Sequence, residues 1–573
     1  MRYSAIVLLM LINGPLAAQF TIAARHHPSR VIIKFKQKSP LLAIVGETDT
    51  GQAASITAAS SPSLLAASFM RKHTLSSLAP LSHRPADREH PSGVGRIFLA
   101  RVSDANALEA VLAGLNADEN IEYAEPDYIG EGAGRRSGAH IENHPGDAIR
   151  EGSTPDDPLF PQQWSLVNEG LPVNGVAGKV GADIQIRDAW ELTTGAEEII
   201  VAILDSGIPP ETAEFSGRLV PGYDFVNDDD DPTDDFGHGS NVSSIAMARG
   251  NNGHVMAGVN WRSKIMPLKI LDSNNRGLYS DWVKAVIFAA DSGARVLNMS
   301  VGGRGNSISL WDAINYAKSK GAIVIASMMN TNSDVPYVPA AFEHVIAVGA
   351  TNNRDERVVP FCWGQNSGSN YGDHIDFVAP GEWILGLYHL NPSQANYWCG
   401  TSQATPLVSG LVSLMLSIAD TLTFDDVYAI LKASSRDRVG PAQEDTTGWD
   451  PYFGWGRIDA ATALNALKVG INEITDRPPV DYALLQNYPN PFNPGTTLRY
   501  RLPKTSFVTL RVFDILGREV ATLVDGVQHG ALHEVRWQAS EQLAGGVYFY
   551  QIKAKPFDGT PVYQATKRMI LLR

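Results

Sequence analysis

The central part of the chain, residues 156–468, alternates short apolar runs with stretches in which apolar residues recur every three or four positions. The run 199–204 is apolar throughout, which is typical of a parallel strand buried on both faces. Strands are also expected at 265–271, 295–301, 322–328, 345–348 and 375–378, with helices between them. This alternation predicts an α/β fold with a doubly wound, mostly parallel sheet and a ligand crevice at the carboxyl ends of its strands.

Two sections of different pattern flank this part. Residues 28–128 carry strand candidates at 31–35 and 96–102 and a helix capped by Asp104, which predicts a small α+β unit. Residues 129–153 are rich in glycine, arginine and polar residues, so we expect an exposed linker. Residues 482–573 contain short alternating stretches between Pro- and Gly-containing turns, which predicts a β-sandwich.

The N-terminus reads as a secretory signal over residues 1–18. Arg2 precedes an apolar run, 5–12, that is followed by small residues suited to cleavage. The run is too short to span a bilayer, and no other apolar stretch approaches the roughly 20 residues that a membrane helix needs. We therefore expect an exported, soluble protein without a transmembrane segment.

Charge and cysteine content narrow the picture further. The 573 residues carry a formal net charge of −14 and no stripe of Lys and Arg, which argues against nucleic acid as a partner. The two cysteines, Cys362 and Cys399, either form a disulfide, which export permits, or remain two free thiols.

Ser402 lies where a glycine turn, Gly400, meets the start of a helix that is apolar nearly all round. Such a helix belongs in the centre of a domain. Pro406 fits the first turn of this helix, where a backbone N–H has no helical partner. Ser402 is then either a plain N-cap or a nucleophile.

A nucleophilic serine needs a base, and the base needs a carboxylate that fixes its tautomer. His238, within Phe-Gly-His-Gly-Ser, and Asp205, at the end of a predicted strand, supply both groups. At these residues the chain resembles the subtilisin-like serine peptidases, and the resemblance extends to 298–303, 337–340, 345–351 and 378–381. It implies a serine endopeptidase with the triad Asp205, His238 and Ser402 and no cofactor in catalysis, whereas the alternative is three unrelated structural residues.

The same resemblance makes Asn330 the side-chain donor of the oxyanion hole, beside the backbone N–H of Ser402; otherwise Asn330 is a loop residue. The chain departs from the family at Ser327-Met328-Met329, where small residues and a glycine are usual, which puts the shape of the specificity pocket in doubt. It also has Asn241 where the family commonly has a second histidine, and Gln403 where the family has methionine.

Two segments resemble the family's substrate-binding edges, between which an extended peptide pairs by its backbone. Such pairing favours a broad endopeptidase, and the alternative is ordinary loop and sheet. The residues concerned are Gly277, Leu278, Tyr279, Ser300, Val301 and Gly302.

A structural calcium ion is a further expectation. Glu214 lies where relatives often carry a carboxylate ligand, and Asn252 lies in a loop that adds oxygen atoms, which Ca²⁺ prefers. The acidic run 228–235 also suggests calcium but fits a solvated loop better.

Residues 28–128 resemble the family's inhibitory propeptide, a ferredoxin-like unit whose end, near 125–128, would occupy the active-site cleft. This implies a zymogen that processes itself by cleavage within 129–153. The resemblance further implies a cis peptide bond between Val338 and Pro339.

The tail resembles the C-terminal sorting domains of the type IX secretion system, on the stretches 485–496, 512–520, 543–550 and 567–572. It implies the secretion machinery as a partner, passage through the periplasm, and a secreted or cell-surface protein. The alternative for the tail is an accessory Ig-like module, and the alternative for the whole chain is a non-catalytic, surface-displayed binding protein.

Overall fold

The computed structural model describes residues 24–43, 56–57, 64–82, 92–137, 154–209, 212–470, 482–484, 487, 492–530, 532–540, 543–557 and 561–571. The expected signal, residues 1–18, lies outside these residues. The chain divides into two compact units, one up to Asn465 and one from Ala466 onward, and each is described by itself.

The first unit begins with an antiparallel sheet in the strand order β5-β1-β4-β3-β2, backed by helices α3 and α4. Its core is closed by apolar side chains from both layers, among them Phe35, Phe69 and Leu115. The elements are β1 (His26–Phe35), β2 (Ile56–Thr57), α3 (Leu64–Lys72), β3 (Leu75–Pro80), β4 (Ile97–Val102), α4 (Leu108–Asn116) and β5 (Ile121–Gly132).

The second sheet of this unit is parallel throughout, in the order β15-β14-β13-β11-β7-β9-β8. The order reverses beside β7, and at such a switch point the loops at the carboxyl ends of the strands open a crevice. Its strands are β7 (Ile200–Asp205), β8 (Tyr223–Asp224), β9 (Lys264–Lys269), β11 (Val296–Met299), β13 (Ile323–Ser327), β14 (Val345–Thr351) and β15 (Phe377–Pro380).

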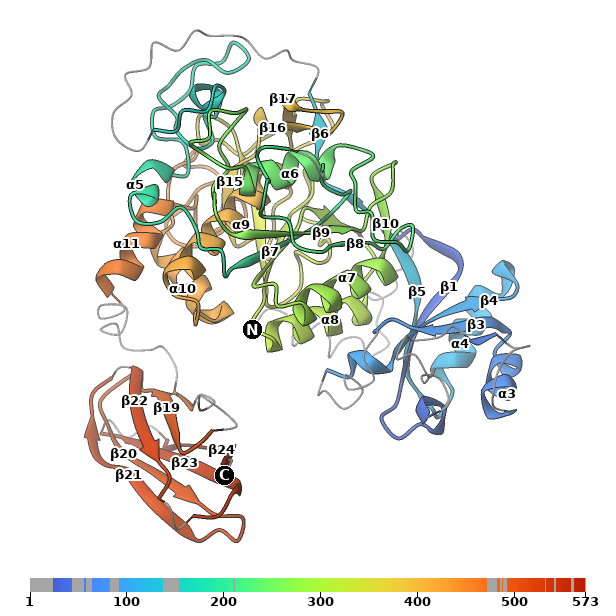
Figure 1. Ribbon diagram of the computed structural model, residues 1–573, viewed down its shortest axis with the longest axis vertical. Helices are drawn as coiled ribbons and strands as arrows, with labels where there is room; N and C mark the ends of the chain where they lie inside the picture. Colours follow the sequence, from blue (N-terminus) through green and yellow to red (C-terminus); the bar gives the residue numbers. More distant parts are fainter. Residues whose placement is uncertain are drawn as a thin grey trace. The chain divides into compact units, whose positions relative to one another are not determined.

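Helices pack in pairs against this sheet: α6 packs against α9, and α7 packs against α8 (Figure 1). The helices of this part are α5 (Ile186–Trp190), α6 (His238–Met247), α7 (Tyr279–Asp291), α8 (Ile308–Ser319), α9 (Thr401–Ile418), α10 (Phe424–Ser434) and α11 (Ala460–Gly470). Within the described residues, α9 alone is long and apolar enough to cross a membrane, but 89% of it is buried inside the protein. It is therefore a core helix, as its all-round apolar pattern predicts.

The expected place of Pro406 in the first turn of α9 is wrong, because the helix begins at Thr401 and Pro406 lies inside it. Proline has no N–H to donate to the carbonyl four residues earlier, which here is that of Ser402. The hydroxyl of Ser300 donates to this carbonyl instead, at 3.0 Å. The bond from Ser300, which replaces the missing helical bond, thus joins α9 to the segment that follows β11.

Strand β5 runs past the end of the N-terminal α+β layer and pairs antiparallel with β10 (Arg276–Leu278) and β12 (Val301–Gly302). After Gly132 the chain continues into β6 (Arg135–Arg136), which pairs with β17 (Asn391–Cys399) beside β16 (Ile384–Tyr388). Residues 129–137 are therefore not the exposed linker that their composition predicts, because edge strands on both sides take up their backbone groups. Residues 138–153 lie outside the described part.

Two acidic side chains of β5 contact helix N-termini of the parallel-sheet layer. The carboxylate of Glu125 accepts hydrogen bonds from the N–H groups of Ile308 and Ser309 in α8, at 2.8 and 3.3 Å. Asp127 accepts from the N–H and the hydroxyl of Ser280 in α7, both at 2.9 Å. Ser280 is not the N-cap of α7, since the helix begins one residue earlier, at Tyr279, and Asp127 accepts the N–H of Ser280 that has no helical partner.

The loop between β14 and β15 is joined covalently to the end of β17. A disulfide joins Cys362 to Cys399, the last residue of β17, across a separation of 37 residues. The cis peptide bond expected between Val338 and Pro339 is confirmed.

The second unit consists of two antiparallel sheets, β18-β19-β22 and β21-β20-β23-β24, with alternating side chains of both sheets in one apolar core. This agrees with the expected β-sandwich. Its strands are β18 (Ala483–Leu484), β19 (Gly495–Arg501), β20 (Ser506–Phe513), β21 (Glu519–Gln528), β22 (Leu532–Gln538), β23 (Gly546–Pro556) and β24 (Tyr563–Leu571).

Candidate active site

Asp205 and His238, which are 33 residues apart in the sequence, meet at the carboxyl edge of the parallel sheet. Asp205 is the last residue of β7 and His238 is the first of α6, and 2.7 Å separates Asp205 Oδ1 from His238 Nδ1. Both side chains are fully buried. A carboxylate at Nδ1 holds the proton there and leaves Nε2 free to accept one.

Ser402 is the second residue of α9, after Gly400 at the N-cap position, so it is not itself the cap. Its hydroxyl donates to the carbonyl of Ser300 at 2.9 Å. Among the described residues, His238 Nε2 has no hydrogen-bond partner. The bond between serine and histidine is therefore not made in this state, although such bonds often form only when the reacting complex tightens.

A backbone carbonyl of the chain's own N-terminal section occupies the space in front of Ser402. The oxygen of Ala133 accepts hydrogen bonds from the N–H of Ser402, at 3.2 Å, and from Nδ2 of Asn330. The N–H and hydroxyl of Thr401 donate to Asn330 Oδ1, at 2.9 and 3.0 Å, and this fixes the amide with its NH₂ toward the carbonyl. Two donors on one carbonyl oxygen are the arrangement that stabilises an oxyanion.

The next residue, Gly134, lies against the imidazole of His238. A Cβ atom added at Gly134 would lie 3.0 Å from His238 Nε2. The intact peptide bond between Ala133 and Gly134 thus has two N–H donors, from Ser402 and Asn330, on its carbonyl side. On its other side lies the unpartnered Nε2 of His238.

The expected substrate edges contact this same segment. Gly277 pairs with Gly130, Val301 pairs with Gly132, and Leu278 and Gly302 belong to the same two ladders. The N–H of Ala133 donates to the carbonyl of Ser300 at 3.0 Å. Tyr279 opens α7, and its ring packs on that of Tyr128 in β5.

Asp234 is a structural residue of the site that the sequence reasoning missed. It is buried and accepts from the hydroxyls of Ser206 and Ser240 and from the N–H of Gly237, at 2.8, 2.5 and 2.8 Å. It therefore anchors the loop that carries His238. An aspartate shortly before a helix start is a capping signal that could have separated it from its exposed neighbours, 228–231.

The two calcium candidates lie together: Asn252 Nδ2 donates to Glu214 Oε2 at 3.1 Å. Burial and the nearby charge of Asp157 raise the pKa of Glu214. The carboxylate oxygens of Glu214 and Asp157 and the side-chain oxygen of Asn252 are of the chemical kind that calcium prefers. In this structure they accept hydrogen bonds from N–H groups. Within the described residues, no three His, Cys, Asp or Glu side chains are grouped as metal ligands.

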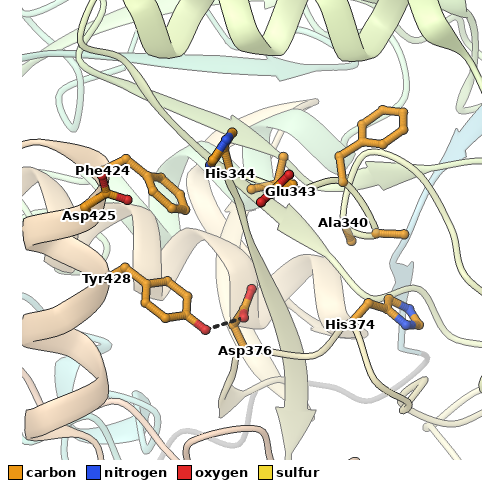
Figure 2. Close-up of a pocket in the computed structure, with 11 residues that line it drawn as sticks. Ala340, Glu343, His344, His374, Asp376, Phe424, Asp425 and Tyr428 are labelled. Carbon is orange, nitrogen blue, oxygen red and sulfur yellow. Dashed lines mark hydrogen bonds between the residues drawn. The ribbon is translucent and has the colours of Figure 1, made fainter. Parts of the chain in front are cut away.

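A separate hollow of about 300 Å³ lies at the opposite edge of the parallel sheet, by the first residue of β14 and the residue before β15. Figure 2 shows Tyr428 pointing at Asp376, to which its hydroxyl donates at 2.7 Å. The carboxyl ends of parallel strands share one edge, so this hollow is not part of the site around Ser402. Another hollow, of about 790 Å³, lies along residues 131–136 and includes Ala133, Asn330 and Trp398 in its lining.

Comparison with known proteins identifies the family. The model of the subtilase family matches residues 196–456. The thermophilic serine proteinase of Bacillus sp. (strain AK1) is 32% identical over 358 residues, which cover 62% of this chain and 76% of the relative. Thermitase of Thermoactinomyces vulgaris is 32% identical over 285 residues, which cover 49% of this chain and 93% of the relative. The chain belongs to the subtilase family.

A solved protease structure from Pseudoalteromonas arctica is 28% identical, with a TM-score of 0.47, and covers 55% of this chain and 100% of its own. A secretion system C-terminal sorting domain matches residues 486–560. The protein is therefore a subtilisin-like serine endopeptidase with a type IX sorting domain, and it is secreted or displayed at the cell surface.

Proposed function

We propose that this subtilase hydrolyses peptide bonds through Ser402, with His238 as the general base. Asp205 orients the imidazole of His238 and stabilises its positive charge once it is protonated. His238 Nε2 takes the hydroxyl proton as Ser402 Oγ bonds to the substrate carbonyl carbon. The oxyanion is stabilised by the N–H of Ser402 and by Asn330. The imidazolium then protonates the leaving amine, and water releases the acyl group by the same steps in reverse.

The first substrate in this proposal is the chain itself, at the bond between Ala133 and Gly134. One observation carries it: the carbonyl of Ala133 accepts from both Ser402 N–H and Asn330. Attack there breaks the amide bond, leaves Gly134 as the new N-terminus and, after hydrolysis, leaves Ala133 as a carboxylate in the cleft. The section before this bond, with its ferredoxin-like succession of strands and helices, then remains as a product-like inhibitor of a self-processed zymogen.

The unprocessed chain supports this assignment over the alternative of residues near Glu125–Tyr128 in the cleft. Glu125 and Asp127 contact α8 and α7 instead, and the six residues that follow reach the site. Cleavage at Ala133–Gly134 falls within the section 129–153 that the sequence indicates, although at its buried rather than its exposed part.

The test is expression of the full chain and of Ser402→Ala, with Ser413→Ala as the matched control. Ser413 is a buried serine of the same helix whose hydroxyl donates to the carbonyl of Gly410. We expect wild type and Ser413→Ala to yield a mature N-terminus at Gly134 and a fluorophosphonate adduct on Ser402. Ser402→Ala is expected to remain uncut in a protease-free host.

Processing of Ser402→Ala as efficient as that of wild type would show that another enzyme makes the cut. A folded wild-type protein that remains unlabelled at Ser402 would favour the alternative, a non-catalytic binding protein on a subtilisin-like fold.

A further inference from the structure

The segment before the Ala133–Gly134 bond shows which side chains each position of the cleft can hold. Counting back from that bond, Ala133 is P1, Gly132 is P2, Glu131 is P3 and Gly130 is P4, while Gly134 is P1′. Three of these five positions are glycine, and each of the three faces a different wall of the cleft.

The P1 position is closed below the methyl group of Ala133. Ala133 packs with Met329 and Tyr337 in a small buried cluster. Met329 Sδ would lie 2.6 Å from a Cβ added at Gly302, so the methionine fills the space between Gly302 and the substrate. Arg304 fixes the tyrosine, because its Nε donates to the Tyr337 hydroxyl at 2.8 Å. A large P1 side chain therefore has no room without displacement of Met329.

The P4 position meets a rigid wall. A Cβ atom at Gly130 would lie 2.2 Å from Cη2 of Trp282 and 3.0 Å from the carbonyl oxygen of Gly302. Trp282 is fully buried in α7 and stacks on Tyr279 with ring centroids 4.7 Å apart. Neither the indole nor the backbone carbonyl can withdraw cheaply in a close-packed interior, so P4 is restricted to glycine.

The P2 position is clamped by Asn275. Its backbone carbonyl accepts from the N–H of Gly132 at 3.1 Å, and its Nδ2 donates to the carbonyl of Gly132 at 3.2 Å. Its side chain thereby covers the place of a P2 Cβ, which would lie 2.4 Å from Asn275 Oδ1. A larger P2 residue must break the side-chain bond.

The P1′ position is the tightest around the reacting groups. A Cβ at Gly134 would lie 2.7 Å from Gln403 Oε1 and 3.0 Å from His238 Nε2. The base cannot move aside without losing its proton-transfer geometry, so a side chain here displaces Gln403 or disables catalysis.

We propose that this subtilase is selective for extended, glycine- and alanine-rich polypeptide segments of the form Gly-Xaa-Gly-Ala-Gly, cut after the alanine. P3 is open, since Glu131 is exposed. The specificity-determining residues are Met329 for P1, Trp282 for P4, Asn275 for P2 and Gln403 for P1′. The proposal rests on the proposed function, because it treats residues 130–134 as substrate, and it narrows the expectation of a broad endopeptidase.

The test uses the self-processed wild-type enzyme and quenched fluorescent peptides based on residues 129–136, Ile-Gly-Glu-Gly-Ala-Gly-Arg-Arg. Three matched peptides carry Phe at P1, Leu at P4 or Leu at P1′. We expect kcat/KM to fall about 100-fold or more for each, since a single excess methylene already costs about 10–200-fold. Equal cleavage of the parent and the Phe-P1 or Leu-P4 peptide would overturn the proposal.

Met329→Gly is the diagnostic variant. Met329 has a φ of 71°, a conformation that glycine adopts without strain, so the substitution suits the backbone. It is expected to raise cleavage of the Phe-P1 peptide at least about tenfold and to leave the Leu-P4 peptide slow. Asn275 has a φ of 62°, which glycine also adopts without strain. Asn275→Gly is therefore expected to raise cleavage of a peptide with Leu at P2.

Failure of this proposal is separable from failure of the proposed function. A processed enzyme that labels with fluorophosphonate but cuts casein chiefly after large residues would overturn the selectivity and leave the catalytic assignment standing. An enzyme that neither processes itself nor labels at Ser402 would overturn both.

Discussion

Gln403 Nε2 donates a hydrogen bond of 2.9 Å to Asn241 Oδ1, directly beside the proposed nucleophile. Both side chains are fully buried. They are the two positions near the triad at which the sequence departs from the pattern expected of subtilisin-like peptidases. The two side chains therefore form one buried polar pair.

Breaking this pair should show coupling. Gln403→Met or Asn241→Ala alone leaves a buried amide unpaired, at a cost of about 1–3 kcal/mol in unfolding free energy. We expect the double variant to cost less than the sum by about 0.5–3 kcal/mol. Denaturant unfolding in a Ser402→Ala background, where self-digestion is absent, measures the cycle, and strict additivity would refute the coupling.

Asn330→Ala should lower kcat about 10²–10³-fold and leave KM nearly unchanged, because the donor acts mainly on the charge of the transition state. Steady-state kinetics on the parent peptide measures both constants. Ser333→Ala, three residues further along the same loop, is the control and is expected to keep wild-type kcat. An unchanged kcat in Asn330→Ala would remove this residue from the oxyanion hole.

Stability of the precursor should depend on pH through Glu125. Burial raises the pKa of this carboxyl to about 7 in the folded chain, although its hydrogen bonds to α8 oppose the shift. A raised carboxyl pKa means that the folded state binds the proton more tightly, so stability falls as pH rises from about 4.5 to 7 and is flat above. Release of the N-terminal section is accordingly favoured at pH 7 and above over acidic pH.

The check is the unfolding free energy of the Ser402→Ala precursor between pH 4.5 and 8.5, with and without Glu125→Gln. The difference between the two proteins isolates Glu125, because all other groups are shared. We expect this difference to change over pH 4.5–7, and a constant difference would contradict the prediction.

Removal of calcium should destabilise the mature enzyme. We propose that Glu214 and Asn252 hold a structural Ca²⁺, which at 100 times its Kd would contribute about 2.7 kcal/mol. Chelation should then lower Tm by about 4 °C. Glu214→Gln is expected to have a lower Tm that no longer responds to chelator, and a wild-type Tm indifferent to chelator would exclude the site.

Truncation after Gly470, which keeps α11 whole, should leave peptide cleavage intact. It should stop transport from the periplasm to the cell surface or the medium. The reason is that the second unit has its own core and contains none of the residues around Ser402. Fractionation of the native host should find the truncated enzyme in the periplasm, whereas full-length Ser402→Ala, the control, should reach the surface or medium. Normal export of the truncated form would favour an accessory module instead.

Sequence alone determined the order of the domains, the parallel sheet and the residues that meet at its edge. Apolar runs and helical periodicity are local signals, and parallel strands necessarily bring the residues that follow them, such as Asp205 and Ser300, to one edge. The family motifs around His238 and Ser402 are short and contiguous, so they can be recognised in one sequence without a structure.

Only the tertiary structure decided what lies in the cleft and how narrow the cleft is. From the sequence, Gly130, Gly132 and Gly134 look like linker glycines, because the side chains that leave no room for a larger residue are far away in the chain. These side chains are Trp282, Asn275 and Gln403. Asn275, for example, is 143 residues from Gly132. Asp127 and Ser280 are separated by 153 residues in the same way. Composition records that a segment is rich in glycine, but only the packing around it shows whether those glycines supply flexibility or fit a space too small for any other residue.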